Sequence, residues 1–247
     1  MKDLKKLCLL TAGMAALAMP MTAQDKVEAT VQADLVSNYI WRGQHLGDIS
    51  VQPTLGIAYK GLSFSAWGNY GLSNSADNDE IDLTLAYTTG GFNVGITDYW
   101  SAKDAKYFSY ASHKTAHVFE ANVGYDFGPV ALQWYTNFAG ADGLNKDGDR
   151  AYSSYFEASA PFKLATCDWT ATVGAVPYAT TSYEKANGFA VTNVSLKAEK
   201  AIKITDSFTL PLFASINTNP STQKAYLVFG FTLKPKQEEN IRTKIKR

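Results

Sequence analysis

The chain has 247 residues, and its 23 Lys and Arg balance its 23 Asp and Glu, so the formal net charge is zero. A neutral chain lacks the basic surface of a nucleic-acid-binding protein, and a hydrophobic content of 46% is too high for a disordered one. No apolar stretch reaches the length of about 20 residues that a transmembrane helix needs. An aromatic content of 13%, together with many Thr, Ser, Gly and Ala, favours β structure.

Residues 1–23 have the pattern of a secretory signal peptide. A basic segment over residues 1–6 precedes an apolar one over 7–20, and Ala23 is the small residue expected before a cleavage site. We therefore expect export and a mature chain that begins at Gln24. Cys8 precedes most of the apolar segment, which argues against a lipid anchor. Cys167 is then the single mature cysteine, and no intramolecular disulfide can form.

The first predicted element is a strand over residues 27–42, because apolar and polar residues alternate there with a period of two. Alternation of this kind gives a strand one apolar and one polar face. Arg42 would end this strand on the polar face, and residues 43–49 would follow as a loop.

The same alternation recurs eleven more times along the chain. The predicted strands cover residues 50–59, 62–70, 80–87, 92–100, 116–125, 130–139, 151–162, 169–178, 190–201, 208–217 and 223–233. Short turns alternate with generally longer, polar loops. An even number of strands with this asymmetry is typical of an outer-membrane barrel. We predict an all-β fold, namely a transmembrane antiparallel up-and-down β-barrel of about 12 strands over residues 24–233.

The two faces of the predicted strands support a barrel in a membrane over a secreted β-sandwich. One face stays apolar in every strand, whereas the other carries mostly Gly, Ser, Thr, Asn, Gln and acids, which are too polar for a dry core. Aromatic residues flank the short turns, where lipid headgroups would lie: Tyr59, Tyr87, Tyr125, Phe92, Trp169 and Phe208. Outer-membrane lipid is thus an expected partner. Pro211 lies inside a predicted strand, where we expect a local bulge.

The segment Ser37-Asn38-Tyr39-Ile40-Trp41-Arg42-Gly43 resembles the start of the TorF family of porin-like proteins, formerly a conserved hypothetical family. Residues 52–53 and 61–68 are similar to that family's second and third strands, and the match is good over roughly 33–100 and diffuse thereafter. Gln44 to Gly47 depart from the family pattern. The resemblance implies an outer-membrane barrel with pore activity, and it implies neither a substrate nor catalytic residues.

Charged residues on the polar face are the candidate lumen-lining residues that would set ion selectivity. They are Glu28, Asp34, Arg42, Asp82, Glu120, Glu157, Lys197 and Glu199. An acidic lumen favours cations. Alternatively, these carboxylates only hydrogen-bond across the interior. Arg42 either guides an anionic solute or pairs with a neighbouring carboxylate, as a buried charge requires. Inward Trp67, Tyr135 and Tyr155 could narrow or plug the bore.

Other chemistry is weakly indicated. Residues 77–80 and 142–149 offer oxygen atoms for Ca²⁺ but lack the EF-hand order, and ordinary polar loops look the same. His113 and His117 lack the context of a zinc site, and His117 is the single outward His of the predicted strands, with no Ser next to it. We expect no catalytic residue, no metal and no cofactor.

The predicted function is a small passive channel in the outer membrane for hydrophilic solutes or ions, mildly cation-preferring, with no nucleic-acid partner. A non-conducting barrel that serves as a structural or interaction scaffold is the alternative, and a lipid-modifying outer-membrane enzyme is a third reading. Residues 234–247 carry six basic and two acidic residues and follow the last strand. They would form a periplasmic tail that is either a solvated extension or a weak contact for an anionic partner.

Overall fold

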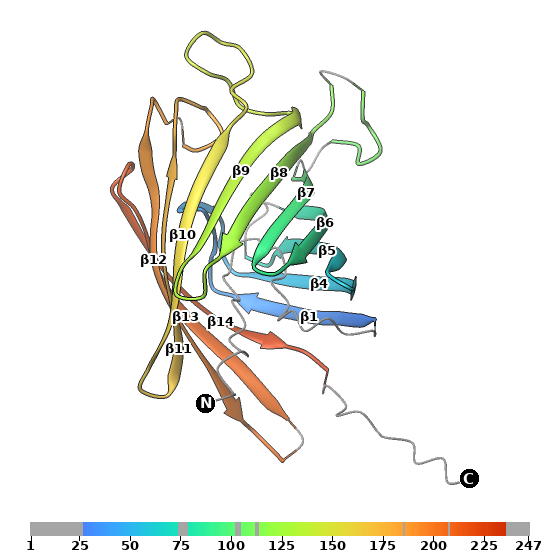
Figure 1. Ribbon diagram of the computed structural model, residues 1–247, viewed down its shortest axis with the longest axis vertical. Coiled ribbons are helices and arrows are strands. Elements are labelled where there is room, and N and C mark those ends of the chain that lie inside the picture. The colour runs from blue at the N-terminus through green and yellow to red at the C-terminus, as the bar shows by residue number, and fades with distance from the viewer. Residues whose placement is uncertain are drawn as a thin grey trace, which may run out of the picture.

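The computed structural model describes residues 27–73, 79–101, 105–111, 114–184, 186–206 and 208–235. Twelve antiparallel strands of this part of the chain close into a barrel in which sequence neighbours pair and β1 pairs with β14 (Figure 1). The predicted fold is thus confirmed. In the described ranges no helix is long and apolar enough to cross a membrane.

The strands are β1 (Glu28–Val36), β2 (Tyr39–Trp41), β3 (Gln44–Gly47), β4 (Ser50–Tyr59), β5 (Leu62–Gly71), β6 (Glu80–Thr89), β7 (Phe92–Trp100), β8 (His117–Asp126), β9 (Ala131–Gly140), β10 (Ser154–Leu164), β11 (Cys167–Val176), β12 (Ala190–Lys203), β13 (Thr209–Asn219) and β14 (Lys224–Leu233).

The register of the wall brings like residues side by side. Leu85 of β6 lies between Phe64 of β5 and Ile96 of β7, and all three side chains are exposed on the outside. The next residue along β6, Thr84, faces the lumen and shares a hydrogen bond of 3.0 Å with Thr97. Because strand side chains alternate between faces, this register places an apolar surface outside and a polar one inside.

The short turns lie at one end of the barrel. The connection of β4 to β5 is Lys60-Gly61, with φ of 48° and 87°, and that of β6 to β7 is Gly90-Gly91, with φ of 55° and 90°. Positive φ at both central residues is the two-residue turn that matches the twist of paired strands. β1 begins and β14 ends at this same end, and the longer loops lie at the other.

The first strand was predicted too long. It leaves the wall after Val36, and β2 and β3 form a separate two-stranded hairpin that folds into the lumen. We call residues 37–49 the inner hairpin. Period-two alternation continues through it because a hairpin is β structure too, so the pattern alone cannot separate it from the wall. The predicted strand over 151–162 also begins later, at Ser154.

The bulge expected at Pro211 is wrong, because neither pairing of β13 shifts register there. Pro211 pairs with β12 just beyond the point where pairing of β13 with β14 ends, at Leu212. Pro161 likewise lies where β10 pairs with β11 and no longer with β9. Each proline therefore lies on a strand edge that has no ladder partner, where its missing N–H costs nothing.

Candidate functional site in the barrel lumen

The inner hairpin crosses the lumen at the long-loop end and contacts several sides of the wall. Tyr39 packs on Trp67 of β5, with ring centroids 5.5 Å apart, and Ile40 joins a buried cluster with Phe213 of β13 and Val228 of β14. Trp41 stacks on Tyr183 of the β11–β12 loop, with ring centroids 5.6 Å apart. The chain's own first loop therefore lies across the lumen at this depth.

Residues of the family-like motif hold the base and the tip of this hairpin. At the base, the Ser37 amide donates to the Phe229 carbonyl (2.8 Å), and the Phe229 amide donates to Ser37 Oγ (2.9 Å). Asn38 Nδ2 donates to the Leu227 carbonyl of β14 (3.0 Å). At the tip, Gly43 has φ of +82°, and a Cβ there would lie 1.8 Å from the Thr192 carbonyl oxygen. Only glycine fits this contact with the wall.

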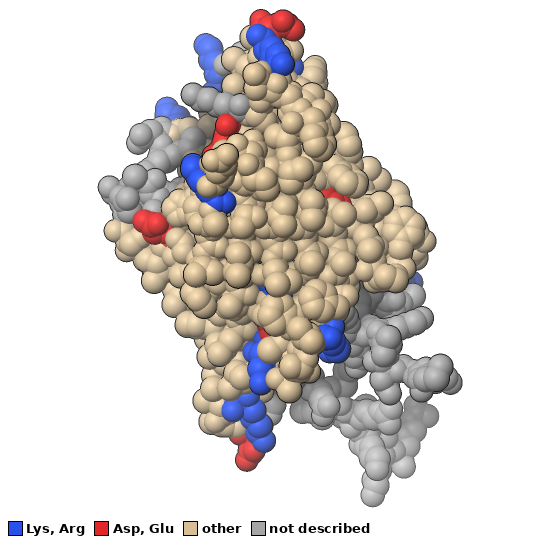
Figure 2. Space-filling view, turned by 90° about the vertical axis from the view of Figure 1, so that its left-hand side faces the viewer, with Lys and Arg blue, Asp and Glu red and all other residues tan. Residues whose placement is uncertain are grey.

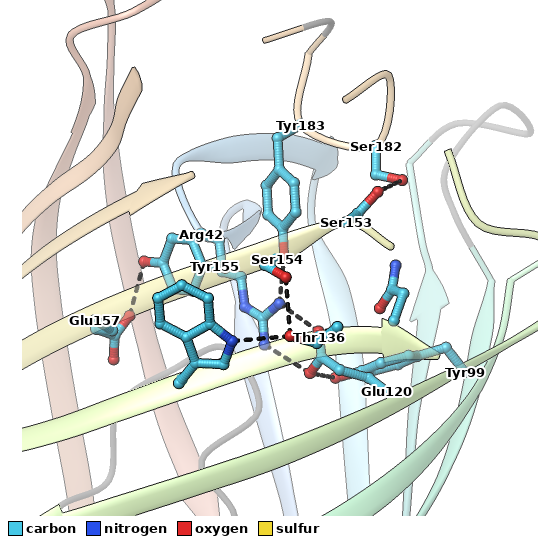
Figure 3. A network of polar contacts seen from close by, with 12 residues as sticks. Arg42, Tyr99, Glu120, Thr136, Ser153, Ser154, Tyr155, Glu157, Ser182 and Tyr183 are labelled. Carbon is cyan, nitrogen blue, oxygen red and sulfur yellow. Dashed lines mark hydrogen bonds and ion pairs between the residues drawn. The ribbon is translucent and has the colours of Figure 1, made fainter. Parts of the chain in front are cut away.

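Arg42 extends from the hairpin tip into a site of four aromatic rings and one carboxylate, and Figure 3 shows it with Glu120 and with two of these rings, Tyr155 and Tyr183. Its guanidinium carbon lies 4.1 Å from the ring centroid of Tyr135, 4.5 Å from Trp41, 4.7 Å from Tyr155 and 6.0 Å from Tyr183. We call these four rings the aromatic cage. Such distances give favourable cation–π contacts.

Glu120 of β8 supplies the negative charge of the site. Arg42 Nη1 and Nη2 donate to its two carboxylate oxygens at 2.6 and 2.8 Å, and Nη1 also donates to the Tyr183 hydroxyl. The Tyr99 hydroxyl donates to Glu120 Oε1 (2.8 Å), so the carboxylate is held from a second side. This is the two-pronged geometry in which arginine binds carboxylates best. Of the two predicted roles of Arg42, the structure places it in the ion pair.

The remaining inward charges are distributed around the wall. Lys197 of β12 pairs with Glu199 (3.0 Å) and lies over the ring of Phe213, and the Tyr155 hydroxyl donates to Glu157 (2.8 Å). Asp82 is buried on β6. Glu28 and Asp34 lie on the inward row of β1.

Sequence reasoning missed Glu80. It is buried, and the Tyr39 hydroxyl donates to its carboxylate (2.9 Å). Glu80 shares a face with Asp82, two residues along β6, and that spacing could have identified it. It adds a further carboxylate to an already acidic interior.

The long loops are held together by polar contacts above the cage. Ser153 and Thr180 share a hydrogen bond of 2.5 Å, and Ser153 Oγ also donates to Ser182 (3.0 Å). The Asp142 carboxylate accepts from the Ser153 amide (2.9 Å) and from Asn137 Nδ2 (2.9 Å). Asp142, the first acid of the candidate Ca²⁺ segment 142–149, thus uses its oxygen atoms within the loops. Residues 77–78 of the acidic segment 77–80, and His113, lie outside the described residues.

His117 lies on the outward side of β8, as predicted, but it is fully buried beneath the loop that precedes it. Its Nδ1 lies 2.6 Å from Asp98 Oδ1, and its Nε2 lies 2.5 Å from the Tyr107 carbonyl oxygen. A hydrolase would need a nucleophilic hydroxyl at Nε2, where this imidazole meets a backbone carbonyl. The Tyr107 contact therefore holds the loop to the wall, and the Asp98 contact joins β8 to β7.

The sequence matches no protein-family model and no curated protein. Among solved structures, the chain is similar to a NanC porin, with a TM-score of 0.47 and 10% identity over 85% of this chain and 100% of that one. It is also similar to a structure described as "Unveiling the Mechanism Behind the in-meso Crystallization of Membrane Proteins", with a TM-score of 0.44 and 7% identity over 86% of this chain and 85% of that one. At these identities and scores, neither likeness says what this chain transports or binds.

Proposed function

We propose that this chain is an outer-membrane β-barrel that forms a small passive channel for hydrophilic solutes or ions, with a mild preference for cations. The observation that carries the proposal is the inverted polarity of the wall. Leu55, Ile57, Leu62, Phe64 and Leu85 are exposed outside, whereas polar side chains are buried inside. A soluble barrel would have the opposite arrangement.

The outer surface supports this placement. On the face shown in Figure 2, Lys, Arg, Asp and Glu gather mainly toward the two ends, and the surface between them is largely free of charge. Tyr59, Tyr87, Phe92 and Tyr125 are exposed near the short turns, where aromatic residues meet lipid headgroups. Membership of the TorF family, export by a cleaved signal peptide and a periplasmic tail at 234–247 are parts of the same proposal.

A specific observation also favours the second candidate, a non-conducting scaffold. The inner hairpin fills the lumen at the long-loop end, so the wild-type barrel is narrow or closed there. The channel and the scaffold differ in one expectation: only the channel should conduct ions when the inner hairpin is displaced from the lumen.

Conductance of the purified protein in planar lipid bilayers tests the proposal. We expect small unitary currents from the wild type and larger ones when the hairpin is displaced. If neither the wild type nor a hairpin-displaced variant carries current, the channel is overturned and the scaffold remains. A protein that remains in the soluble fraction without detergent would overturn both.

A further inference from the structure

The site that holds Arg42 is built mostly from residues outside the inner hairpin. Glu120 and Tyr135 belong to the wall strands β8 and β9, Tyr155 belongs to β10, and Tyr183 belongs to the β11–β12 loop. Trp41 is the one ring that the hairpin itself contributes. Glu120 is oriented by Tyr99 of β7, and Tyr155 by its hydrogen bond to Glu157. The carboxylate, Tyr135 and Tyr155 would therefore stay in place if Arg42 left, and Tyr183 would keep its stacking on Tyr155, with ring centroids 5.7 Å apart.

The arrangement is specific for a planar guanidinium. Two N–H groups meet the two oxygens of Glu120, while the guanidinium carbon lies 4.1–4.7 Å from the ring centroids of Tyr135, Trp41 and Tyr155. A compact ammonium can make neither the two-pronged contact nor the stacked one. Lys197, which is also buried in the described part of the chain, shows the contrast, because its single nitrogen lies 3.0 Å from a Glu199 oxygen and 4.6 Å from the ring centroid of Phe213.

We propose that this cage is a lumenal binding site for solutes that carry a guanidinium group, and that Arg42 is the occupant supplied by the chain itself. A solute that enters the cage exchanges with Arg42, removes the ion pair to Glu120 and releases the tip of the inner hairpin from the bore. The inference rests on the proposed channel, since the solute arrives through the lumen.

The exchange is a competition between a free ligand and a tethered one. A group tethered by a short segment acts at an effective concentration on the order of millimolar. Free guanidinium compounds must therefore compete at similar concentrations in the wild type. Without Arg42 they should bind at least about tenfold more tightly, because the internal competitor is gone.

The experiment uses the full mature chain, folded in detergent, with methylguanidinium as the probe. Arg42→Ala should unfold at a lower temperature than the wild type, and methylguanidinium at millimolar concentration should restore much of the loss. Methylammonium at the same concentration should not. Lys197→Ala is the matched control, because it also removes a buried, ion-paired cation but leaves no cage.

Absence of rescue, equal rescue by methylammonium, or equal rescue of Lys197→Ala would each overturn the site. If Arg42→Ala does not fold, the wild type is titrated instead, with tryptophan fluorescence as the signal. Trp41 stacks on Tyr183 and should report release of the hairpin, and the change should vanish in Trp41→Phe. No change with methylguanidinium, or the same change with methylammonium, would overturn the site here too.

Failure of this site is distinguishable from failure of the channel. Binding is measured in detergent and needs no conduction. If no current is seen in bilayers but methylguanidinium still stabilises Arg42→Ala, only the channel is overturned. If the wild type conducts but methylguanidinium does not stabilise Arg42→Ala, only the guanidinium site is overturned. In a conducting bilayer, methylguanidinium should raise the wild-type current, and a current that falls would overturn the proposed release of the hairpin.

Discussion

Neighbouring residues of β6 face two different environments, and this gives a test at the scale of single side chains. Leu85 is 44% exposed between Phe64 and Ile96, whereas Thr84 faces Thr97 inside. In a membrane, Leu85→Arg should destabilise the barrel by about 2–4 kcal/mol, the cost of an arginine on the lipid face near the midplane. Thr84→Arg, the matched control, should fold. Unfolding in urea with lipid vesicles present measures both, and equal losses would contradict the register.

Two prolines lie at positions where one edge of their strand has no hydrogen-bonding partner. Pro161 and Pro211 lie on β10 and β13, on the two outer strands of a four-stranded group that continues past the pairing with β9 and β14 (Figure 1). An unpaired strand edge is a template for pairing with another chain, and a proline blocks it. Sequence alone could not explain Pro211, because the end of a pairing depends on how the strands are staggered.

At the scale of elements, the wall could be predicted from the sequence and the inner hairpin could not. The alternation in β4 to β14 follows from one apolar and one polar environment, and both are properties of the barrel as a whole. The inner hairpin alternates as well, but its surroundings are the interior of a barrel that exists only after closure. The cage was missed for the same reason, because Arg42, Glu120 and Tyr183 are far apart in sequence and on different elements.

The inner hairpin gives a test through two glycines of nearly identical conformation. Gly43 has φ of +82° and contacts the Thr192 carbonyl, whereas Gly148, in a long loop, has φ of +84°, and a Cβ added there would meet nothing within 4 Å. Gly43→Ala should force the hairpin tip away from the wall and raise the unitary conductance in planar bilayers. Gly148→Ala carries a similar backbone strain, of about 1–2 kcal/mol, and should leave conductance unchanged. Similar currents from both variants would mean that the hairpin does not obstruct the path.

At the scale of the whole molecule, the even number of strands places the start of β1 and the end of β14 at the same end of the barrel. With twelve strands, β1 begins and β14 ends on the side of the short turns, so we expect that side in the periplasm and the long loops outside. A cysteine at Ser182, in a Cys167→Ser background, should react with an impermeant maleimide on whole cells. A cysteine at Gly61 should react only after the outer membrane is broken. Labelling of Gly61 but not of Ser182 on whole cells would show that the barrel has the opposite orientation.

The balance of inward charge predicts ion selectivity. Among the described residues, seven carboxylates that are buried or half-buried lie on the inward faces of the wall strands (Glu28, Asp34, Glu80, Asp82, Glu120, Glu157 and Glu199). Two cations of the same kind, Arg42 and Lys197, face them, and each lies in an ion pair with a carboxylate. Reversal potentials in a KCl gradient should therefore show a mild cation preference. The preference should fade in concentrated salt, because the screening length falls from about 10 Å at 0.1 M to about 3 Å at 1 M.

Glu28 and Asp34 are suitable acids with which to test this preference, because Arg42 pairs with Glu120 and not with either of them. We therefore expect the inner hairpin to keep its position when these two residues are substituted. Glu28→Gln with Asp34→Asn should reduce the cation preference, in the wild type or in a Gly43→Ala background if the wild type is silent. Asp206→Asn removes one charge at the same end of the barrel, from a turn whose side chain is 98% exposed, and should leave the reversal potential unchanged. An anion preference, or an equal effect of the turn substitution, would show that the lumenal carboxylates do not set the selectivity.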